Sequence, residues 1–179
     1  MNTRRLISRK GVPLRRIDAI GFTLVELMVT IAVMAILLGI AVPSFNEAML
    51  GSKLSSFASS LSGSALLARS EAIKRNEPVT LCVSSTGTAC GTGSWEQGWI
   101  VISDGGTVLH SHAALPSGLK VIEAAANDEL VFRPTGVGAT SATFTVCRAT
   151  PSAGGQERVV TISATGRADV DKTTNGACS

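Results

Sequence analysis

Residues 24–42 are the most constraining feature of this chain. They form a 19-residue apolar stretch in which Glu26 is the only charged residue. As an α-helix that rises about 1.5 Å per residue, the stretch is roughly 28 Å long, close to the thickness of the hydrocarbon core of a bilayer. The sequence therefore predicts a helix that crosses a membrane once.

Charge is distributed unevenly along the chain. Six of the 16 basic residues lie in the first 21 positions, where Asp18 is the only acid. A basic cluster before a span stays in the cytoplasm, which places the residues after 42 on the opposite side of the membrane. Removing these seven residues from the totals of 16 basic and 13 acidic residues leaves 10 and 12, a formal charge of −2. This balance argues against a general polyanion-binding surface.

The start of the apolar stretch has an unusual order of residues. Gly21 precedes the aromatic Phe22, and Glu26 is the fifth residue when Phe22 is counted as the first. A secretory signal has its cleavage site after the apolar core, and a plain anchor has no need for an acid near its start. The run GFTLVEL at 21–27 resembles the type III signal of type IV prepilins.

This resemblance implies a processing route and a role for the acid. Prepilin peptidase would cut after Gly21, remove the leader 1–21 and N-methylate Phe22, and the apolar helix would be retained. A carboxylate in an apolar helix costs on the order of 2.5–3.5 kcal/mol at the bilayer centre and less near the interface, so Glu26 should have a partner. In the pilin family the partner is the N-terminal amine of a neighbouring subunit, which sets axial register. The alternative is a plain anchor with Glu26 among the lipid headgroups.

Gly39 and Pro43 are the helix breakers of this segment. Proline removes one hydrogen bond of the helix and crowds the preceding turn, so a kink or a locally melted stretch is expected at 39–43. Counted from Phe22, Pro43 is the 22nd residue, a position where type IV pilins commonly have proline. The resemblance implies that this stretch can unwind in a filament, and a simple kink at the membrane exit is the alternative.

Apolar residues after Pro43 recur every three or four positions, which is the period of one helical face. They are Leu50, Leu54, Phe57, Leu61, Ala65, Ala68 and Ala72. The serines of the other side are expected to face water: Ser52, Ser55, Ser56, Ser59, Ser60 and Ser62. Basic residues and a proline at 74–78 signal the helix end. One helix is thus predicted over about 22–75, with a membrane or filament-core half at 22–50 and an amphipathic half at 51–76.

Short β-rich runs separated by turn residues follow the helix. The predicted strands are 79–83, 98–103, 107–112, 119–123, 130–132, 142–148, 158–163 and 166–170. They predict an α+β fold in which the long N-terminal helix packs, by its amphipathic half, on an antiparallel β-rich domain at 77–179.

Two further motifs narrow the resemblance. The run ARSEAIKRN at 68–76, followed by VTLC at 79–82, and the run WEQGW at 95–99 resemble the GspH/FimT branch of type IV pilin-like proteins. This branch includes FimT- and FimU-type minor pilins and the H-type pseudopilin of type II secretion. The resemblance runs from Gly21 to about Gly166 and implies the type IV pilin fold.

The function implied by the resemblance is that of a minor pilin, a low-abundance subunit near the tip that helps prime assembly of a pilus. Such a subunit resides in the inner membrane before it enters the filament. Its implied partners are other pilin or pseudopilin subunits, the prepilin peptidase, the inner-membrane assembly platform and membrane lipid. An H-type pseudopilin in protein export and a pilus-borne DNA receptor are the alternatives.

The four cysteines all follow the apolar stretch. An even count beyond a membrane span suggests disulfides in an oxidising compartment, and none of the cysteines has a metal-finger spacing. Three pairings are possible. We favour Cys82–Cys90, which closes a short loop, with Cys147–Cys178, which ties down a polar C-terminal tail.

Other chemistry has weaker support in the sequence. His110 and His112 stand two apart on one predicted strand and share a face, but no third metal ligand is evident, so a surface pair is expected. The chain has no nucleophile elbow, Walker A loop or HExxH helix, so neither an enzyme nor a cofactor is predicted. Trp99 begins an apolar strand and should be core, whereas Trp95 in a glycine-rich loop is the better candidate for an exposed interface.

The DNA-receptor alternative depends on one short element. Some FimT-like pilins bind DNA through a C-terminal Gly-Arg-x-Arg element, and the matching stretch here is GRAD at 166–169. Asp169 replaces the second arginine and Asp171 follows it, so phosphate near Arg167 would meet repulsion. Arg148 and Arg158 compensate only if the fold brings them beside Arg167. Binding of nucleic acid is therefore expected to be weak and lost with salt.

Overall fold

The computed structural model describes residues 21–137, 139–150, 153–173 and 178, with only the backbone for Pro43 and Ser44. Residues 1–20 of the expected leader lie outside the described residues. The chain divides into two compact units, Met1–Ala41 and Val42–Ser179. Helix α1, Leu24–Arg75, runs from the first unit into the second.

Local interactions set the two ends of α1. The backbone N–H of Glu26 donates to Thr23 Oγ1 at 3.2 Å, so Thr23 is the N-cap and the helix begins at Leu24, two residues after the predicted start. The helix ends at Arg75, as predicted. Asn76 follows with φ of 55°, the left-handed conformation that commonly ends helices.

The helix continues without a break through residues 39–43. Of the two expected alternatives, the locally melted stretch is therefore wrong for this structure, and a kink stays a prediction. Proline removes one hydrogen-bond donor, and the helical backbone passes through Pro43 without that bond. The side chain of Pro43 lies outside what the structure describes.

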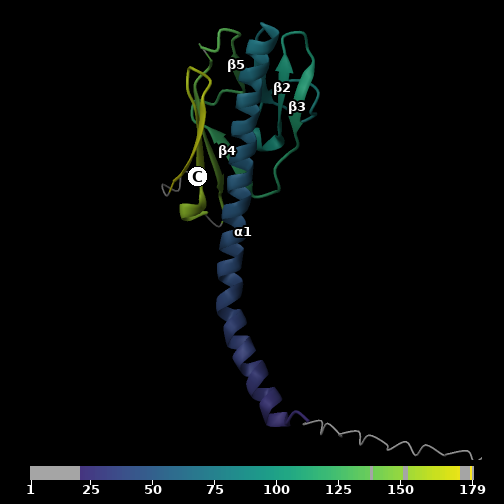
Figure 1. Cartoon of the computed structure of the whole chain (residues 1–179), viewed down its shortest axis with the longest axis vertical. Helices are drawn as coiled ribbons and strands as arrows, with labels where there is room; N and C mark the ends of the chain where they lie inside the picture. The colour runs from purple at the N-terminus through teal and green to yellow at the C-terminus, as the bar shows by residue number, and fades with distance from the viewer. Residues whose placement is uncertain (1–20, 138, 151–152, 174–177, 179) are drawn as a thin grey trace, which may run out of the picture. The chain divides into compact units, whose positions relative to one another are not determined.

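Eight strands follow the helix in the described residues and form two antiparallel four-stranded sheets. One sheet has the order β3-β2-β1-β5 and the other β4-β6-β7-β8. The bounds are β1 Val79–Val83, β2 Trp99–Ser103, β3 Val108–His112, β4 Leu119–Glu123, β5 Glu129–Phe132, β6 Ala142–Arg148, β7 Arg158–Ile162 and β8 Ala168–Lys172. Figure 1 shows β2 and β3 to one side of the C-terminal part of α1 and the last strands, in yellow, to the other.

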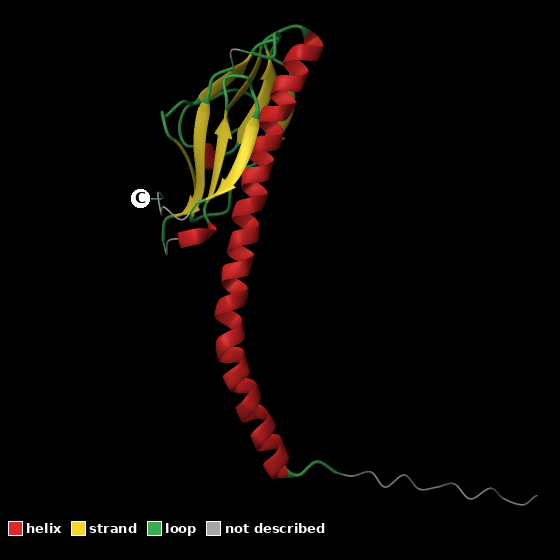
Figure 2. Ribbon diagram, turned by 60° about the vertical axis from the view of Figure 1, so that its left-hand side comes forward, coloured by secondary structure: helices red, strands yellow, loops and turns green. Residues whose placement is uncertain are grey.

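One face of the C-terminal part of α1 forms the core with both sheets, as Figure 2 shows for the strands beside this part of the helix. The helix contributes Leu50, Leu54, Ala58, Leu61, Ala65, Ala68 and Ala72, all buried. The sheets contribute larger side chains, among them Trp99, Phe132 and Phe144. Alanine on the helix lets the backbone approach the sheets, and the aromatic side chains fill the space between them.

The predicted water-facing serines differ in exposure. Ser52, Ser56 and Ser59 are exposed, as expected, Ser55 and Ser60 are half-buried, and Ser62 is buried. Ser62 lies four residues after Ala58 and three before Ala65, so it belongs to the edge of the buried face. The predicted exposure of Ser62 is therefore wrong.

Candidate assembly site

In the described residues, the first unit is an apolar helical segment that no other part of that unit covers. Every large apolar side chain between Phe22 and Ile40 is exposed, by 50% to 74%. This is also the one helix, among the described residues, that is long and apolar enough to cross a membrane. So much apolar surface is unfavourable in water, and lipid or the helices of other subunits would bury it.

Glu26 is the acid within this apolar surface, and its side chain is exposed. The Thr23 cap holds the backbone of Glu26 in the first turn, where a negative charge interacts favourably with the helix dipole. Within the described residues the carboxylate has no hydrogen bond or ion pair. Gly21 and Phe22 precede the helix and are also exposed, so the expected cleavage point is accessible.

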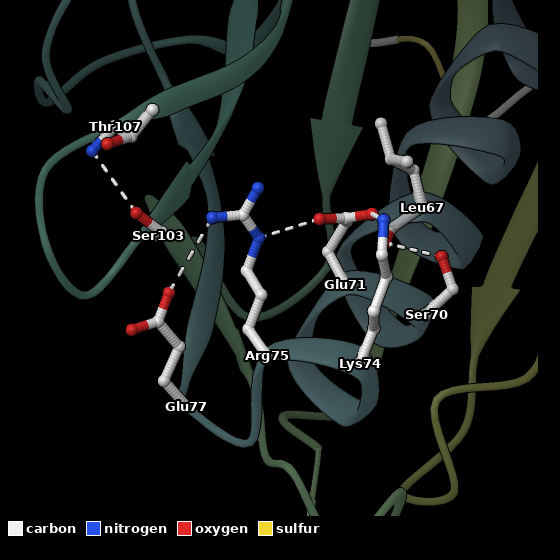
Figure 3. A network of polar contacts seen from close by, with 8 residues as sticks. All are labelled: Leu67, Ser70, Glu71, Lys74, Arg75, Glu77, Ser103 and Thr107. Atoms are coloured by element: carbon white, nitrogen blue, oxygen red, sulfur yellow. Dashed lines mark hydrogen bonds and ion pairs between the residues drawn. The ribbon is translucent and has the colours of Figure 1, made fainter.

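A network of polar contacts lies at the C-terminal end of α1 (Figure 3). Arg75 Nε lies 2.6 Å and Lys74 Nζ 3.2 Å from the carboxylate oxygens of Glu71. The hydrogen bond from Arg75, and then that from Lys74, hold the pKa of the Glu71 carboxyl below its ordinary value. This stabilisation is present above the carboxyl's ordinary pKa and is lost as pH falls through the lowered value.

Two disulfides secure the domain. Cys82 joins Cys90, and Cys147 joins Cys178. These are the pairs that the sequence argument favours among the three possible pairings. The first closes the loop after β1, and the second fastens the C-terminal end of the chain to β6.

Both tryptophans are buried, although the sequence predicts burial for Trp99 alone. Trp99 is fully buried, as predicted. Trp95 is only 2% exposed, so its prediction as an interface residue is wrong. Its ring meets Phe144 edge to face at 4.9 Å, and its Nε1 donates to the carbonyl of Asn127 at 2.9 Å. Trp95 is therefore a core residue whose ring and N–H both have a partner.

His110 and His112 share one face of β3, as predicted. Both rings line a groove of about 340 Å³ whose other walls are Ser60, Gly63, Ser64 and Leu67 of α1. The ring of His112 stacks on Trp99 with centroids 3.9 Å apart. Among the described residues, no three or more His, Cys, Asp or Glu side chains gather in a metal-binding cluster.

Arg167 is exposed in the turn between β7 and β8, as its backbone bonds to Ser163 show. Arg158 pairs with Lys172 at the opposite end of this hairpin. Arg148 lies at that same far end, two residues beyond the Val146↔Arg158 pair. Neither arginine stands beside Arg167, so the compensation considered from the sequence does not occur.

Arg69 of α1 lies beside this turn. Its Cδ is 2.9 Å from where a Cβ on residue 166 would stand, and Gly166 has φ of +69°. Glycine at 166 therefore gives the turn its conformation and also makes room for Arg69. No local sequence pattern indicates this contact, because its two sides are far apart along the chain.

A long N-terminal helix whose C-terminal part packs on antiparallel sheets is the type IV pilin fold. Solved structures with this fold resemble the chain. The type IV minor pilin FimU of Pseudomonas aeruginosa strain PAO1, in two crystal forms, is 23% identical with TM-scores of 0.54 and 0.55; the matches cover 70% and 72% of this chain and 100% and 96% of FimU. The minor pseudopilin EpsH of the Vibrio cholerae type 2 secretion system is 14% identical, with a TM-score of 0.48 and coverage of 67% and 97%.

Family models give the assignment. Residues 58–166 match the family described as type II transport protein GspH, and residues 19–42 match the prokaryotic N-terminal methylation motif. The first match covers more than half of the chain. The chain therefore belongs to the GspH family of pilin and pseudopilin subunits. No curated protein matches the chain significantly.

Proposed function

We propose that this chain is a minor type IV pilin, a low-abundance structural subunit that helps prime assembly of a pilus and sits near its tip. One observation carries the proposal: the N-terminal methylation motif at 19–42 contains an apolar helical segment whose large side chains from Phe22 to Ile40 are all exposed. The exposed apolar surface of such a helix is unfavourable in water. It needs lipid before assembly and other subunits after it.

The proposed route begins in the inner membrane. The prepilin peptidase cuts after Gly21 and methylates the new N terminus at Phe22. The helix stays in the bilayer, with the disulfide-bonded domain in the periplasm, where disulfides form and persist. The assembly platform then passes the subunit into the filament.

Glu26 is proposed to set the register of the subunit. The N-terminal amine of a neighbouring subunit would pair with this carboxylate, since it has no partner within the described residues. Burial of the apolar helices between subunits then lowers the effective dielectric around the pair and strengthens it. Pro43 is proposed to let residues near it unwind as the helices pack.

A second role is supported by the description of the family itself. That description names type II transport, so an H-type pseudopilin acting in protein export is the runner-up. Both roles use the same helix and the same acid, and they differ in the filament that receives the subunit.

A deletion strain, complemented with the wild-type gene, tests the choice. We expect loss of surface pili by electron microscopy, with unchanged amounts of exported proteins in the culture medium. In sheared pili of the complemented strain, quantitative mass spectrometry should find the chain as a small fraction of the major subunit. Normal piliation with lost export would instead assign the pseudopilin role.

A further inference from the structure

The histidine pair of β3 has a position that suits metal binding. β3 is the edge strand of its sheet, and His112 pairs with Trp99 while His110 pairs with Val101. Residues two apart on a strand project from the same face, with Cα atoms about 6.6 Å apart. Both rings line the groove between β3 and α1. A single ion in this groove is within reach of both imidazoles.

His112 is held in the orientation of a metal ligand. Its ring lies parallel to the indole of Trp99, with an interplanar angle of 7°, and Phe57 meets it edge to face at 6.0 Å. Nδ1 lies 2.8 Å from the carbonyl oxygen of Ala113. A carbonyl only accepts, so Nδ1 is the donor, and in the neutral ring the lone pair is then on Nε2. Metal-binding histidines are commonly fixed by such a bond from the other ring nitrogen.

The rest of the groove accepts a cation without repulsion. Its lining contains no lysine or arginine. Ser64 is already engaged, because its hydroxyl accepts from Trp99 Nε1 at 3.0 Å and donates to the carbonyl of Ser60 at 2.9 Å. His110 is exposed, so its ring is free to turn toward the ion. Water would complete the coordination shell.

The composition of the chain makes this pair distinctive. The chain has two histidines, and both are in the pair. All four cysteines are in disulfides, so no thiolate competes for a soft metal. Imidazole ligands suit Zn²⁺, Ni²⁺ and Cu²⁺, and Cu²⁺ binds most tightly in the general order of divalent ions.

We propose that His110 and His112 form a two-imidazole site for a late first-row divalent metal ion, with Cu²⁺ preferred. His112 is the preoriented ligand and His110 the mobile one. Both ligands are on β3, and the site does not depend on the proposed role of the N-terminal part of α1 in assembly.

Fluorescence titration of the full-length chain in detergent micelles with Cu²⁺ tests the proposal. A paramagnetic ion on His112 lies close to the Trp99 indole and should quench its emission. Three variants separate the ligands: His110→Gln, His112→Phe, which keeps an aromatic ring on Trp99 but has no nitrogen, and the double variant. The double variant measures binding by the N-terminal amine and carboxylates.

The expected result is saturable quenching at one ion per chain. Each single variant should bind at least about tenfold more weakly. Loss of a group that only hydrogen-bonds to a metal ligand already weakens metal binding by about tenfold or more, and these variants lose a ligand itself. The double variant should retain background quenching only. Zn²⁺ should raise the melting temperature of the wild type and leave that of the double variant unchanged.

Equal Cu²⁺ affinity in the wild type and the double variant would overturn the proposal. So would equal affinity in the wild type and His110→Gln, because the two rings would then not act together. This second comparison does not use His112→Phe. It uses His110→Gln, which should fold as the wild type does because His110 is exposed.

Discussion

Gly98 lies where the backbone of two other segments leaves no room for a side chain. It has φ of +110°, and a Cβ there would stand 2.6 Å from the carbonyl oxygen of His112 and 3.0 Å from that of Ser84. Both contacts are with backbone, which cannot rotate away. Gly118 has a similar φ of +88° but nothing within 4 Å of the Cβ position, so it is a matched control.

We expect Gly98→Ala to destabilise the domain much more than Gly118→Ala. Both variants carry the cost of a non-glycine residue at positive φ, on the order of 1–3 kcal/mol. Gly98, with ψ of 168°, lies in a region that almost only glycine occupies. Gly98→Ala adds a backbone displacement of the kind caused by overpacking, about 1–3 kcal/mol more. Urea unfolding of the two variants in the same detergent measures the difference. Equal losses would show that the backbone around Gly98 yields without cost.

The C-terminal part of α1 has one face in the core and one in water, and two leucines report on them. Leu61 is fully buried, whereas Leu66 is 45% exposed. Leu61→Ala should lower the free energy of unfolding by about 2–5 kcal/mol, through lost burial and the cavity left behind. Leu66→Ala should change it by about 0.5 kcal/mol or less. Both changes are Leu to Ala in one helix, so their effect on helix propensity is nearly the same and the difference between them reports burial. Thermal or urea unfolding measures it. A larger loss of stability for Leu66→Ala than for Leu61→Ala would contradict the assignment of the two faces.

Most elements were predictable from the sequence because their signals are local. Strands β4 and β6 have the bounds that hydrophobic runs and turn residues predict, and α1 ends at the predicted residue. Thr23 shortens the start of α1 because its side chain caps a backbone donor instead of joining the helix. The division into two sheets depends on pairing between distant strands, which no local pattern contains.

The candidate site was predictable in part, for the same reason. The signal around Glu26 is a short run in one segment, so the sequence locates it directly. Trp95 shows where such reasoning stops: a glycine-rich loop suggests exposure, but Phe144 and Asn127 bring its ring inward from distant parts of the chain. The contact of Arg69 with the turn at Gly166 is non-local in the same way.

At the scale of the whole molecule, the proposed processing can be tested on the protein taken from membranes. We expect protein extracted from membranes of a peptidase-competent strain to begin at Phe22 with a methylated amine. Intact-mass measurement should therefore show loss of residues 1–21 and the gain of one methyl group. In a strain without the peptidase the full chain should remain. An N terminus beyond residue 42 in the competent strain would indicate an ordinary secretory signal instead.

Replacement of Glu26 tests whether the exposed apolar helix serves assembly or only anchors the chain. Glu26→Ala removes a polar group from an apolar segment, so insertion into the membrane should be unchanged. Incorporation into filaments should fall at least about tenfold, because an amine left unpaired in a buried site costs about 3–5 kcal/mol and 1.4 kcal/mol is already a factor of ten. Glu47→Ala is the matched control, an exposed acid of the same helix beyond the apolar stretch. Immunoblots of membranes and of sheared filaments measure the two quantities, and normal amounts of the Glu26→Ala chain in filaments would refute the proposed pairing with the neighbouring amine.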